Sequence, residues 1–172
     1  YQGQIELYLG EQRLVTRTLE LGIGPVIGAV SYGELRPTAT WNDVVDDAAL
    51  GRVVALLSRA AWSLFGELVR SAADPEGWLT HLVLRRLARP DRAEVVERLP
   101  HLVETPLVAT SSGAKISVAK IEETVALHGH ITWVPMSTPD VSLADPPVLR
   151  ERPAVLEALR VLLGVKMLVE GD

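Results

Sequence analysis

Alternation of apolar and polar side chains at the start of the chain predicts a β-hairpin. Residues 4–9 alternate in the way a half-buried strand does. A turn at 10–12 separates them from a second alternating stretch, 14–21, so the two stretches are expected to pair with each other. The short apolar and β-branched stretch 26–30 predicts a third, more buried strand.

Apolar residues at three- and four-residue steps then predict a long helix that ends near Ser71. The sequence Thr40-Trp-Asn-Asp43 has the Thr-x-x-acid form of a helix start, so we expect the helix to begin there. A second helix follows, with Asp74 as its cap and Pro75 at its first position. A shorter helix is expected to end near Leu99.

The second half of the chain predicts strands and helices in alternation. The predicted strands are 106–110, 131–134 and 165–169. The first helix between them is capped by Ser117 and ends at Gly129. A proline-rich loop at 139–152 then leads to the second helix, 154–163. Strands joined by helices favour a small parallel sheet with a right-handed crossover.

These elements together predict an α/β protein of three parts. A first α/β unit occupies 1–72, a helical connector 73–100, and a second, smaller α/β unit 101–172. With 48% hydrophobic residues and a formal net charge of -5, the chain is not expected to be disordered. The first residue is Tyr1, so we expect the chain to be a piece of a longer protein.

Composition excludes several kinds of chemistry. The chain has no cysteine, which excludes disulfides, thiolate metal sites and cysteine nucleophiles. Its acidic balance argues against nucleic acid as a partner. The densest apolar stretch, 53–69, is interrupted by charged residues, and no signal peptide is visible, so we expect a cytoplasmic protein that does not bind a membrane.

No motif in the chain predicts a catalytic site. There is no glycine-rich phosphate loop and no serine in a nucleophile elbow. The pair His128 and His130 offers too few ligands for a metal, and a histidine near a helix C-terminus is the simpler interpretation. The turn at 111–113 could bind an anion, although a plain tight turn is the more common use of such residues.

Charged clusters are also best explained without catalysis. The acidic pairs at 46–47 and 122–123 lie on or beside predicted helices, where adjacent residues point in different directions. The one basic cluster is predicted to be a solvated face, with a small anion or partner site as the alternative. Its members are Arg85, Arg86, Arg89 and Arg92.

The four tryptophans divide into two groups. Trp62, Trp78 and Trp133 fall on apolar positions of predicted elements and are expected in the core. Trp41 stands at a loop-to-helix junction, where no periodicity places it inside. It either caps the core or is a partly exposed anchor for a partner, a role in which tryptophan is enriched.

The order of segments resembles the middle region of the heat-shock protein 90 chaperone family. That region has an apolar-x-Leu-Tyr-Val strand, a leucine-proline turn, an apolar strand, a Leu-Pro-Leu-Asn-x-Ser-Arg-Glu stretch and a long helix. The matching segments here are 5–9, 21–25, 26–31, 35–42 and the helix to Val69. Later segments are similar in the same order, at 106–113, 117–118, 131–133, 146–151 and 165–168.

The resemblance implies a function for the chain and a departure from the family. It implies a middle-region fragment that couples an N-terminal ATPase domain to client proteins, with a first unit like ribosomal protein S5 in fold. In the family, an arginine of this region reaches the nucleotide's terminal phosphate. In this chain Trp41 stands at the position of that arginine, and Asn42 stands at the position of the glutamate that follows it in the family. Arg36 lies five residues before Trp41. A neutral indole cannot supply the positive charge.

The resemblance therefore predicts a partner-binding region that is not itself an enzyme. We expect Trp41 and Arg36 to contact clients or the parent's own nucleotide domain. ATP and magnesium would be cofactors of the parent alone, and the chain itself would neither bind nor hydrolyse ATP. The alternative is the transducer segment of another ATPase with the same nucleotide domain, in signalling or DNA repair. A stand-alone small-molecule enzyme is the third hypothesis, and the motifs leave it without residues.

A missing part of the family's pattern also predicts self-association. The family has further strands before the hairpin, which are absent here. Strand 4–9 is therefore expected to form an unpaired edge. This edge is open to pairing with another chain, because it contains no proline and only Glu6 as a charge. We expect a homodimer formed through this edge of the hairpin. The alternative is a monomer in which the long helix alone covers the hairpin.

Overall fold

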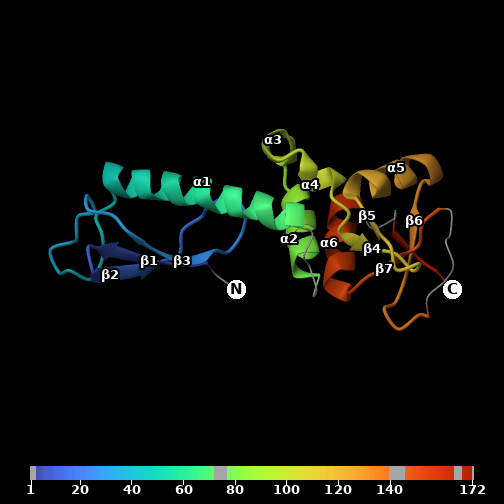
Figure 1. Ribbon diagram of the computed structural model, residues 1–172, viewed down its shortest axis with the longest axis horizontal. Coiled ribbons are helices and arrows are strands. Elements are labelled where there is room, and N and C mark those ends of the chain that lie inside the picture. Colours follow the sequence, from blue (N-terminus) through green and yellow to red (C-terminus); the bar gives the residue numbers. More distant parts are fainter. Residues whose placement is uncertain (1–2, 72–76, 140–145, 165–167, 172) are drawn as a thin grey trace. The chain divides into compact units, whose positions relative to one another are not determined.

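The computed structural model describes residues 3–71, 77–139, 146–164 and 168–171 (Figure 1). It is a mixed α/β protein, which confirms the predicted class. The chain divides into two compact units, with the boundary between Phe65 and Gly66, whereas the sequence predicted three parts at 1–72, 73–100 and 101–172. Each unit is described separately below.

The first unit contains a three-stranded sheet in the order β2-β1-β3. Strand β1 (Gln4–Leu9) pairs antiparallel with β2 (Gln12–Arg17), which confirms the hairpin. Strand β3 (Ile27–Ser31) pairs with the other side of β1 and runs parallel to it. The prediction that 4–9 is an unpaired edge is therefore wrong, because the chain after β2 returns far enough to place β3 beside β1. The prediction that β3 is more buried than the hairpin is also wrong, because its side chains are alternately exposed and half-buried.

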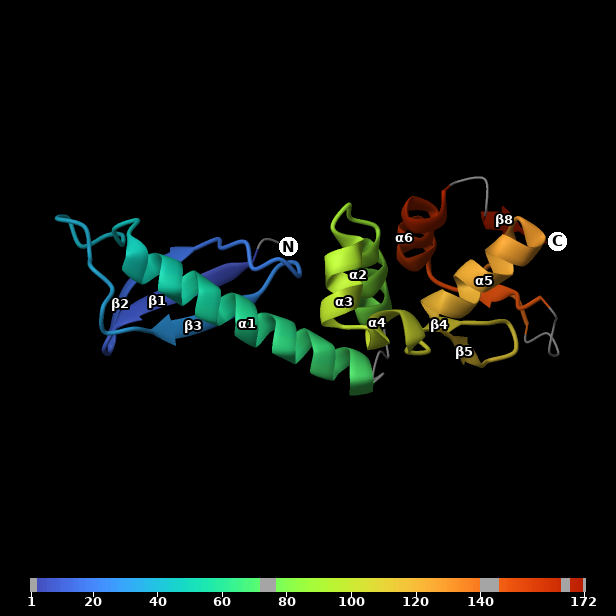
Figure 2. The same cartoon turned by 90° about the horizontal axis from the view of Figure 1, so that it is seen from above.

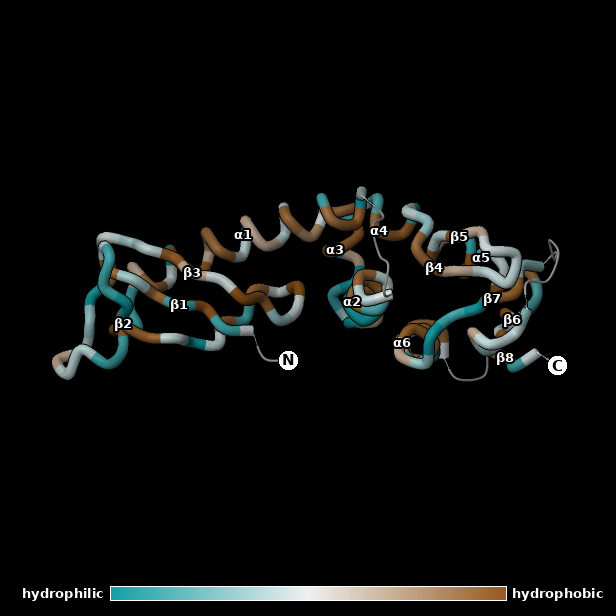
Figure 3. Tube along the Cα trace, turned by 60° about the horizontal axis from the view of Figure 1, so that its bottom comes forward, coloured by the Kyte–Doolittle hydropathy of each residue, from teal (hydrophilic) through white to brown (hydrophobic). Residues whose placement is uncertain are grey.

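Helix α1 (Ala48–Ser71) covers one face of this sheet (Figures 1 and 2). Ile5 and Leu7 of β1 point to this face and are almost fully buried, as are Val53 and Phe65 of the helix. Hydrophobic and more polar stretches alternate along α1 in Figure 3, as expected for a helix with one buried face. The core of the first unit is the layer between β1 and α1.

The long helix begins later than the sequence predicted. The expected start at Thr40–Asp43 is wrong, since the helix begins only at Ala48. The carboxylate of Asp47 accepts hydrogen bonds from the N–H groups of Ala49 (2.8 Å) and Leu50 (3.2 Å), which is how an N-cap works. The Thr-x-x-acid stretch instead forms the tip and base of a loop.

By length and hydropathy alone, α1 could cross a membrane, and it is the one such helix among the residues described. The core helix of a soluble protein passes the same test. In this structure Val53 and Phe65 of α1 are buried, whereas Leu56 and Leu64 are exposed. Length and hydropathy therefore do not distinguish a membrane-spanning helix from the core helix of a soluble protein.

The second unit begins within the last turns of α1, and three further helices follow. They are α2 (Trp78–Leu87), α3 (Arg92–Arg98) and the short α4 (His101–Glu104), of which the sequence predicted the first two. The predicted cap of α2 at Asp74 lies outside the described residues, and the first residue described there is Gly77, with a φ of 69°. Helix α2 packs against α6 (Pro153–Leu163), so these helices share one unit with the later strands.

The parallel sheet of the second unit is confirmed only in part. Strand β6 (Ile131–Val134) runs parallel to β8 (Leu168–Glu170), as predicted for the last two strands. The third strand of that sheet is β7 (Leu149–Arg150), which lies in the predicted proline-rich loop.

The predicted strand 106–110 belongs to a different sheet. Its strand, β4 (Val108–Ala109), pairs antiparallel with β5 (Lys115–Ile116), and only an isolated antiparallel bridge joins Thr110 to Leu149. The reason is local, because Thr110 N–H donates to Ala114 O at 2.8 Å and turns the chain back on itself. Helix α5 (Val118–His128) follows, with the predicted cap at Ser117 and with Gly129 at a φ of 77°.

Candidate functional site

The segment between β3 and α1 folds into a hairpin-like loop, which we call the Trp41 loop (residues 35–47). Pro37 and Val44 form an antiparallel bridge at its base. Thr38 N–H donates to Asp43 O at 2.9 Å, and Val45 N–H donates to Arg36 O at 2.8 Å. These bonds make the loop a defined structure rather than an open connection.

Buried apolar residues and one arginine fix the base of the Trp41 loop to the first unit. Leu35 and Val44 are both buried in the core. The guanidinium of Arg17, on β2, donates to the Asp43 carboxylate at 2.8 Å, to the Asp46 carboxylate at 2.6 Å and to Val44 O at 2.9 Å. A planar guanidinium can satisfy three acceptors at once, so a single side chain anchors the returning half of the loop, residues 43–46, to β2.

A second arginine links the loop to the start of α1. The Nε of Arg36 donates to Oδ2 of Asp47 at 2.7 Å, while Oδ1 of the same carboxylate caps the helix. Hydrogen bonding to Arg36 lowers the pKa of Asp47, and hydrogen bonding to Arg17 lowers the pKa of Asp43. The lowered pKa values lie further from neutral pH than that of an ordinary aspartate, which makes each carboxylate a weaker general base.

The tip of the loop is reinforced by three polar side chains. The hydroxyl of Thr40 donates to the Asn42 side-chain oxygen at 2.6 Å, and that of Thr38 donates to the same oxygen at 3.2 Å. The backbone N–H of Trp41 donates to Thr38 O at 3.0 Å. The backbone on both sides of Trp41 is thus held by local hydrogen bonds.

Trp41 has the most unusual environment in the described part of the chain. Its φ is 57°. All other described residues with a positive φ are glycines. A bulky side chain is strained in this region of φ, at a cost of about 1–3 kcal/mol. The indole is nevertheless 53% exposed, although burial would normally repay such a cost. A strained and exposed tryptophan points to binding rather than to stability.

The structure brings the two predicted contact residues into one loop but gives them different positions. Trp41 is at the tip, while Arg36 is at the base and forms an ion pair with Asp47. Sequence reasoning missed the role of Arg17, which is far from the loop in sequence and carries no motif. The acidic pair 46–47 is also divided, with Asp46 bonded to Arg17 and Asp47 to Arg36.

The three tryptophans predicted in the core have three different environments. Trp62 is buried beside Phe65, with a ring-centroid distance of 6.2 Å, which confirms the prediction. Trp133 is half-buried, and the Arg160 guanidinium lies 5.8 Å from its ring centroid. The prediction for Trp78 is wrong, because it is 59% exposed at the first position of α2, where a side chain leans past the end of the helix.

Other sequence candidates do not assemble into a site. Nδ1 of His130 lies 3.1 Å from His128 O, and both histidines are exposed. Among the described residues, no three metal-ligating side chains come together. The residues 111–113 form a tight turn, in which Gly113 N–H donates to Thr110 O at 3.0 Å. This fits the interpretation as a plain turn rather than as an anion-binding turn.

The basic cluster is only partly a solvated face. Arg86 is buried and forms two hydrogen bonds to the Asp91 carboxylate, at 2.7 and 2.6 Å. Arg92 forms two to Glu122, at 2.7 and 2.9 Å, and so joins α3 to α5. The prediction of a solvated face is wrong for Arg86, since two-point pairing with a carboxylate compensates for burial of the charge.

Comparison with known proteins adds no further candidate. No protein-family model matches the chain, and neither a curated protein nor a solved structure is similar to it. The Trp41 loop is therefore the candidate functional site on the strength of its own geometry. What it can do chemically follows from the indole, which offers a large apolar surface and a single N–H donor.

Proposed function

We propose that this chain is the middle region of a cytoplasmic, chaperone-like ATPase, and that the Trp41 loop contacts its protein partners. The observation that carries the proposal is the strained and exposed Trp41 on a reinforced loop. An indole fixed in this way loses little conformational entropy when a partner covers it, because its backbone is already ordered. Apolar segments of client proteins and the parent's nucleotide domain are the partners that fit.

The order of elements supports the same proposal. Strands and a long helix come first, then short helices, and then small sheets with helices, and one of these sheets is three-stranded and parallel. This is the order of segments in the heat-shock protein 90 middle region that the sequence resembles. The proposal includes that the first unit is a diverged form of the family's S5-like fold and that the second is a small α/β sandwich.

The loop's chemistry argues for binding rather than for catalysis. Trp41 and Asn42 carry no charge, and the guanidinium of Arg36 is paired with Asp47. Stabilising a transferring phosphoryl group needs positive charge close to it. We therefore expect no heat signal for Mg-ATP binding to this chain in isothermal titration calorimetry, and no hydrolysis. Micromolar binding would contradict this part of the proposal.

The binding role of Trp41 can be tested by the suppression of heat-induced citrate synthase aggregation, followed by light scattering. We expect the wild-type chain to slow aggregation and Trp41→Gly to lose most of that effect. Glycine adopts a φ near 57° without strain, so this variant should remain folded and should not melt at a lower temperature.

The matched control is Trp78→Ala, which removes an indole of similar exposure from the second unit. We expect this variant to suppress aggregation as well as the wild type does. An equal loss in both variants would mean that any exposed indole suffices. No suppression by the wild-type chain would contradict client binding.

A further inference from the structure

Strand β3 forms one edge of the first sheet. It pairs with β1 on one side, and the strand order β2-β1-β3 leaves its other side without a neighbouring strand (Figure 2). An unpaired edge presents backbone donors and acceptors that can template the addition of another strand.

One hydrogen bond shows which backbone groups of β3 point away from the sheet. Tyr32 N–H donates to Tyr8 O at 3.1 Å, so the N–H of Tyr32 points toward β1. Because this direction alternates along a strand, the N–H and C=O groups of Ile27, Ala29 and Ser31 point outward. No described residue pairs with these outward groups.

The two edges of this sheet differ in how well they are protected. The β2 edge carries Arg13 and Arg17, and the pairing of β1 with β2 shifts register between Leu7 and Tyr8. Charges and bulges are the usual means of preventing strand addition. Strand β3 has the sequence Ile-Gly-Ala-Val-Ser, with neither a charge nor a proline. The unprotected edge is thus β3.

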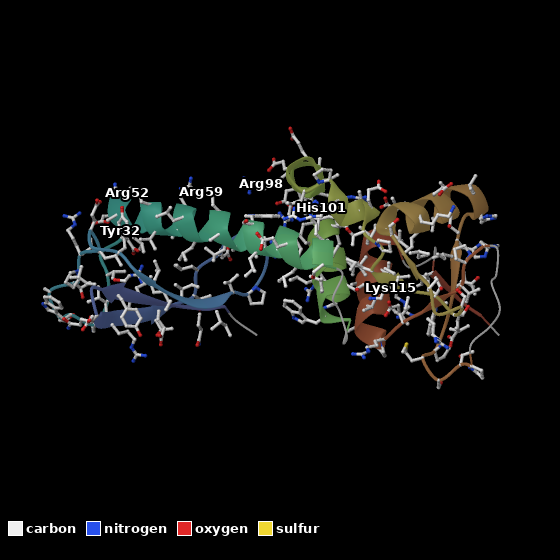
Figure 4. The ribbon with its side chains drawn as sticks, viewed as in Figure 1. Tyr32, Arg52, Arg59, Arg98, His101 and Lys115 are labelled. Carbon is white, nitrogen blue, oxygen red and sulfur yellow. The ribbon has the colours of Figure 1, made fainter. Side chains whose placement is uncertain are left out.

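The ends of β3 limit what can pair with it. Pro25 lies two residues before the strand and cannot donate a backbone hydrogen bond. After the strand, Arg52 Nε donates to the Tyr32 hydroxyl at 3.2 Å and also forms an ion pair with Glu34 (Figure 4). The open edge therefore suits an extended segment of about five residues, the length of β3 itself.

The side chains on the outer face of β3 indicate the chemistry of that segment. Register with β1 places Ile27 and Ala29 on the face opposite Ile5 and Leu7. Ile27 is 79% exposed, the largest exposure of any large apolar side chain described. A segment with an apolar or β-branched residue beside Ile27, and no charge along its length, would cover this surface.

We propose that β3 binds an extended, uncharged segment of a non-native protein as an added strand. This rests on the proposed chaperone function and names the class of segment that the first unit takes. A second copy of the chain is a poorer occupant, because stable dimers bury roughly 1,600 Å² and a five-residue edge contributes only a small part of that. Transient binding of one strand needs only main-chain bonds and a few side-chain contacts.

The test is fluorescence anisotropy with a fluorescein-labelled nonapeptide that alternates valine and threonine between terminal lysines. We expect Ala29→Pro, which removes one outward N–H, to weaken binding roughly tenfold. Gly28 precedes the substitution and tolerates a following proline. The matched control Ala29→Thr keeps the N–H and should bind within about threefold of the wild type.

Peptides methylated on backbone nitrogen provide a test that does not depend on the variant's folding. Methylation of every second amide blocks one edge of the peptide strand and leaves the other edge free. We expect one methylated peptide to lose binding roughly tenfold and its complement to bind nearly as well as the parent peptide. Equal losses with both peptides, or no binding by the wild type, would overturn the proposal.

The remaining outcomes separate this proposal from the others. A concentration-dependent dimer in light scattering that disappears in Ala29→Pro, without peptide binding, would assign the edge to a second copy and overturn the proposal. If Trp41→Gly lost aggregation suppression but still bound the peptide as the wild type does, β3 would be supported as a separate site. If peptide binding failed while aggregation was still suppressed through Trp41, the inference on β3 would fail and the proposed function would not.

Discussion

The two units of this protein bury different kinds of side chain. Among the described residues of the first unit, those that are buried are all apolar, and Leu7 and Phe65 are almost fully buried. In the second unit the described residues include six buried polar or charged side chains. They are Thr80, Arg86, Thr110, Ser111, Thr124 and Glu151.

Strand length explains part of this difference. Arg86 and Thr124 lie on helices, whereas the other four residues lie next to the short strands in sequence or, in the case of Thr80, donate to the residue before one. The strands of the first unit are five or six residues long and satisfy one another's backbone groups, so the core between sheet and helix needs no polar side chain. In the second unit several strands have only two residues, and side chains complete the hydrogen bonding. Thr80 donates to Leu107 O at 3.1 Å, and the Glu151 carboxylate accepts from Ala109 N–H at 2.6 Å. Short strands therefore make polar side chains part of the core.

The comparison predicts that the largest loss of stability will come from the apolar core of the first unit. Leu7→Ala should lower the free energy of unfolding by about 3 kcal/mol, because it removes a fully buried side chain and leaves a cavity. Urea unfolding followed by tryptophan fluorescence measures this. The same substitution at the exposed Leu127, on α5, should cost less than about 0.5 kcal/mol. Equal losses would mean that β1 is not the centre of the core.

A smaller loss should come from the buried carboxylate of the second unit. Glu151→Ala removes a buried carboxylate and leaves the half-buried Ala109 N–H without its acceptor, which should cost about 1–3 kcal/mol. Glu151→Gln keeps one acceptor oxygen and should cost less. Hydrogen exchange of the Ala109 amide is the specific measurement, since it should speed up in the alanine variant. Unchanged exchange would show that another acceptor takes over.

The cap of α5 should contribute less again. The Ser117 hydroxyl oxygen accepts from Lys120 N–H at 3.2 Å, so Ser117→Ala should lower the free energy of unfolding by about 1 kcal/mol. Ser117→Asp keeps an acceptor at the N-terminus of the helix and should retain most of the stability. Thermal unfolding by circular dichroism distinguishes the two variants. A loss of the same size in both would argue against capping.

The smallest predicted effect is the pH dependence of the Trp41 loop. Arg17 lowers the pKa of Asp43, so the ionised carboxylate favours the folded state. Its contribution is present above the ordinary aspartate pKa of about 3.9 and is lost as the pH falls through the lower pKa of the folded state. The wild type should therefore have a higher urea midpoint than Asp43→Asn at pH 7, and the gap should close in acid. A gap that is independent of pH would contradict the role of this ion pair.

Local signals in the sequence predicted the elements that depend on a few neighbouring residues. The cap at Ser117 and the positive φ of Gly129 follow from the chemistry of single residues, and the first hairpin follows from alternation around a short turn. The buried position of Trp62 follows from helical periodicity. These features could be predicted because the interactions that stabilise them lie within a few residues along the chain.

Tertiary structure alone decided what depends on distant residues. Strand β1 became central because β3 returned to its free side, and a two-residue strand at Leu149 took the place expected for 106–110. The Trp41 loop depends on Arg17, which reaches it from β2. Pairing between segments far apart in sequence follows from the shape of the whole unit, and no local pattern specifies it. The sequence by itself determined the first hairpin, the main helices and the cap at Ser117, whereas tertiary packing decided the strand order, the start of the long helix and which tryptophans are exposed.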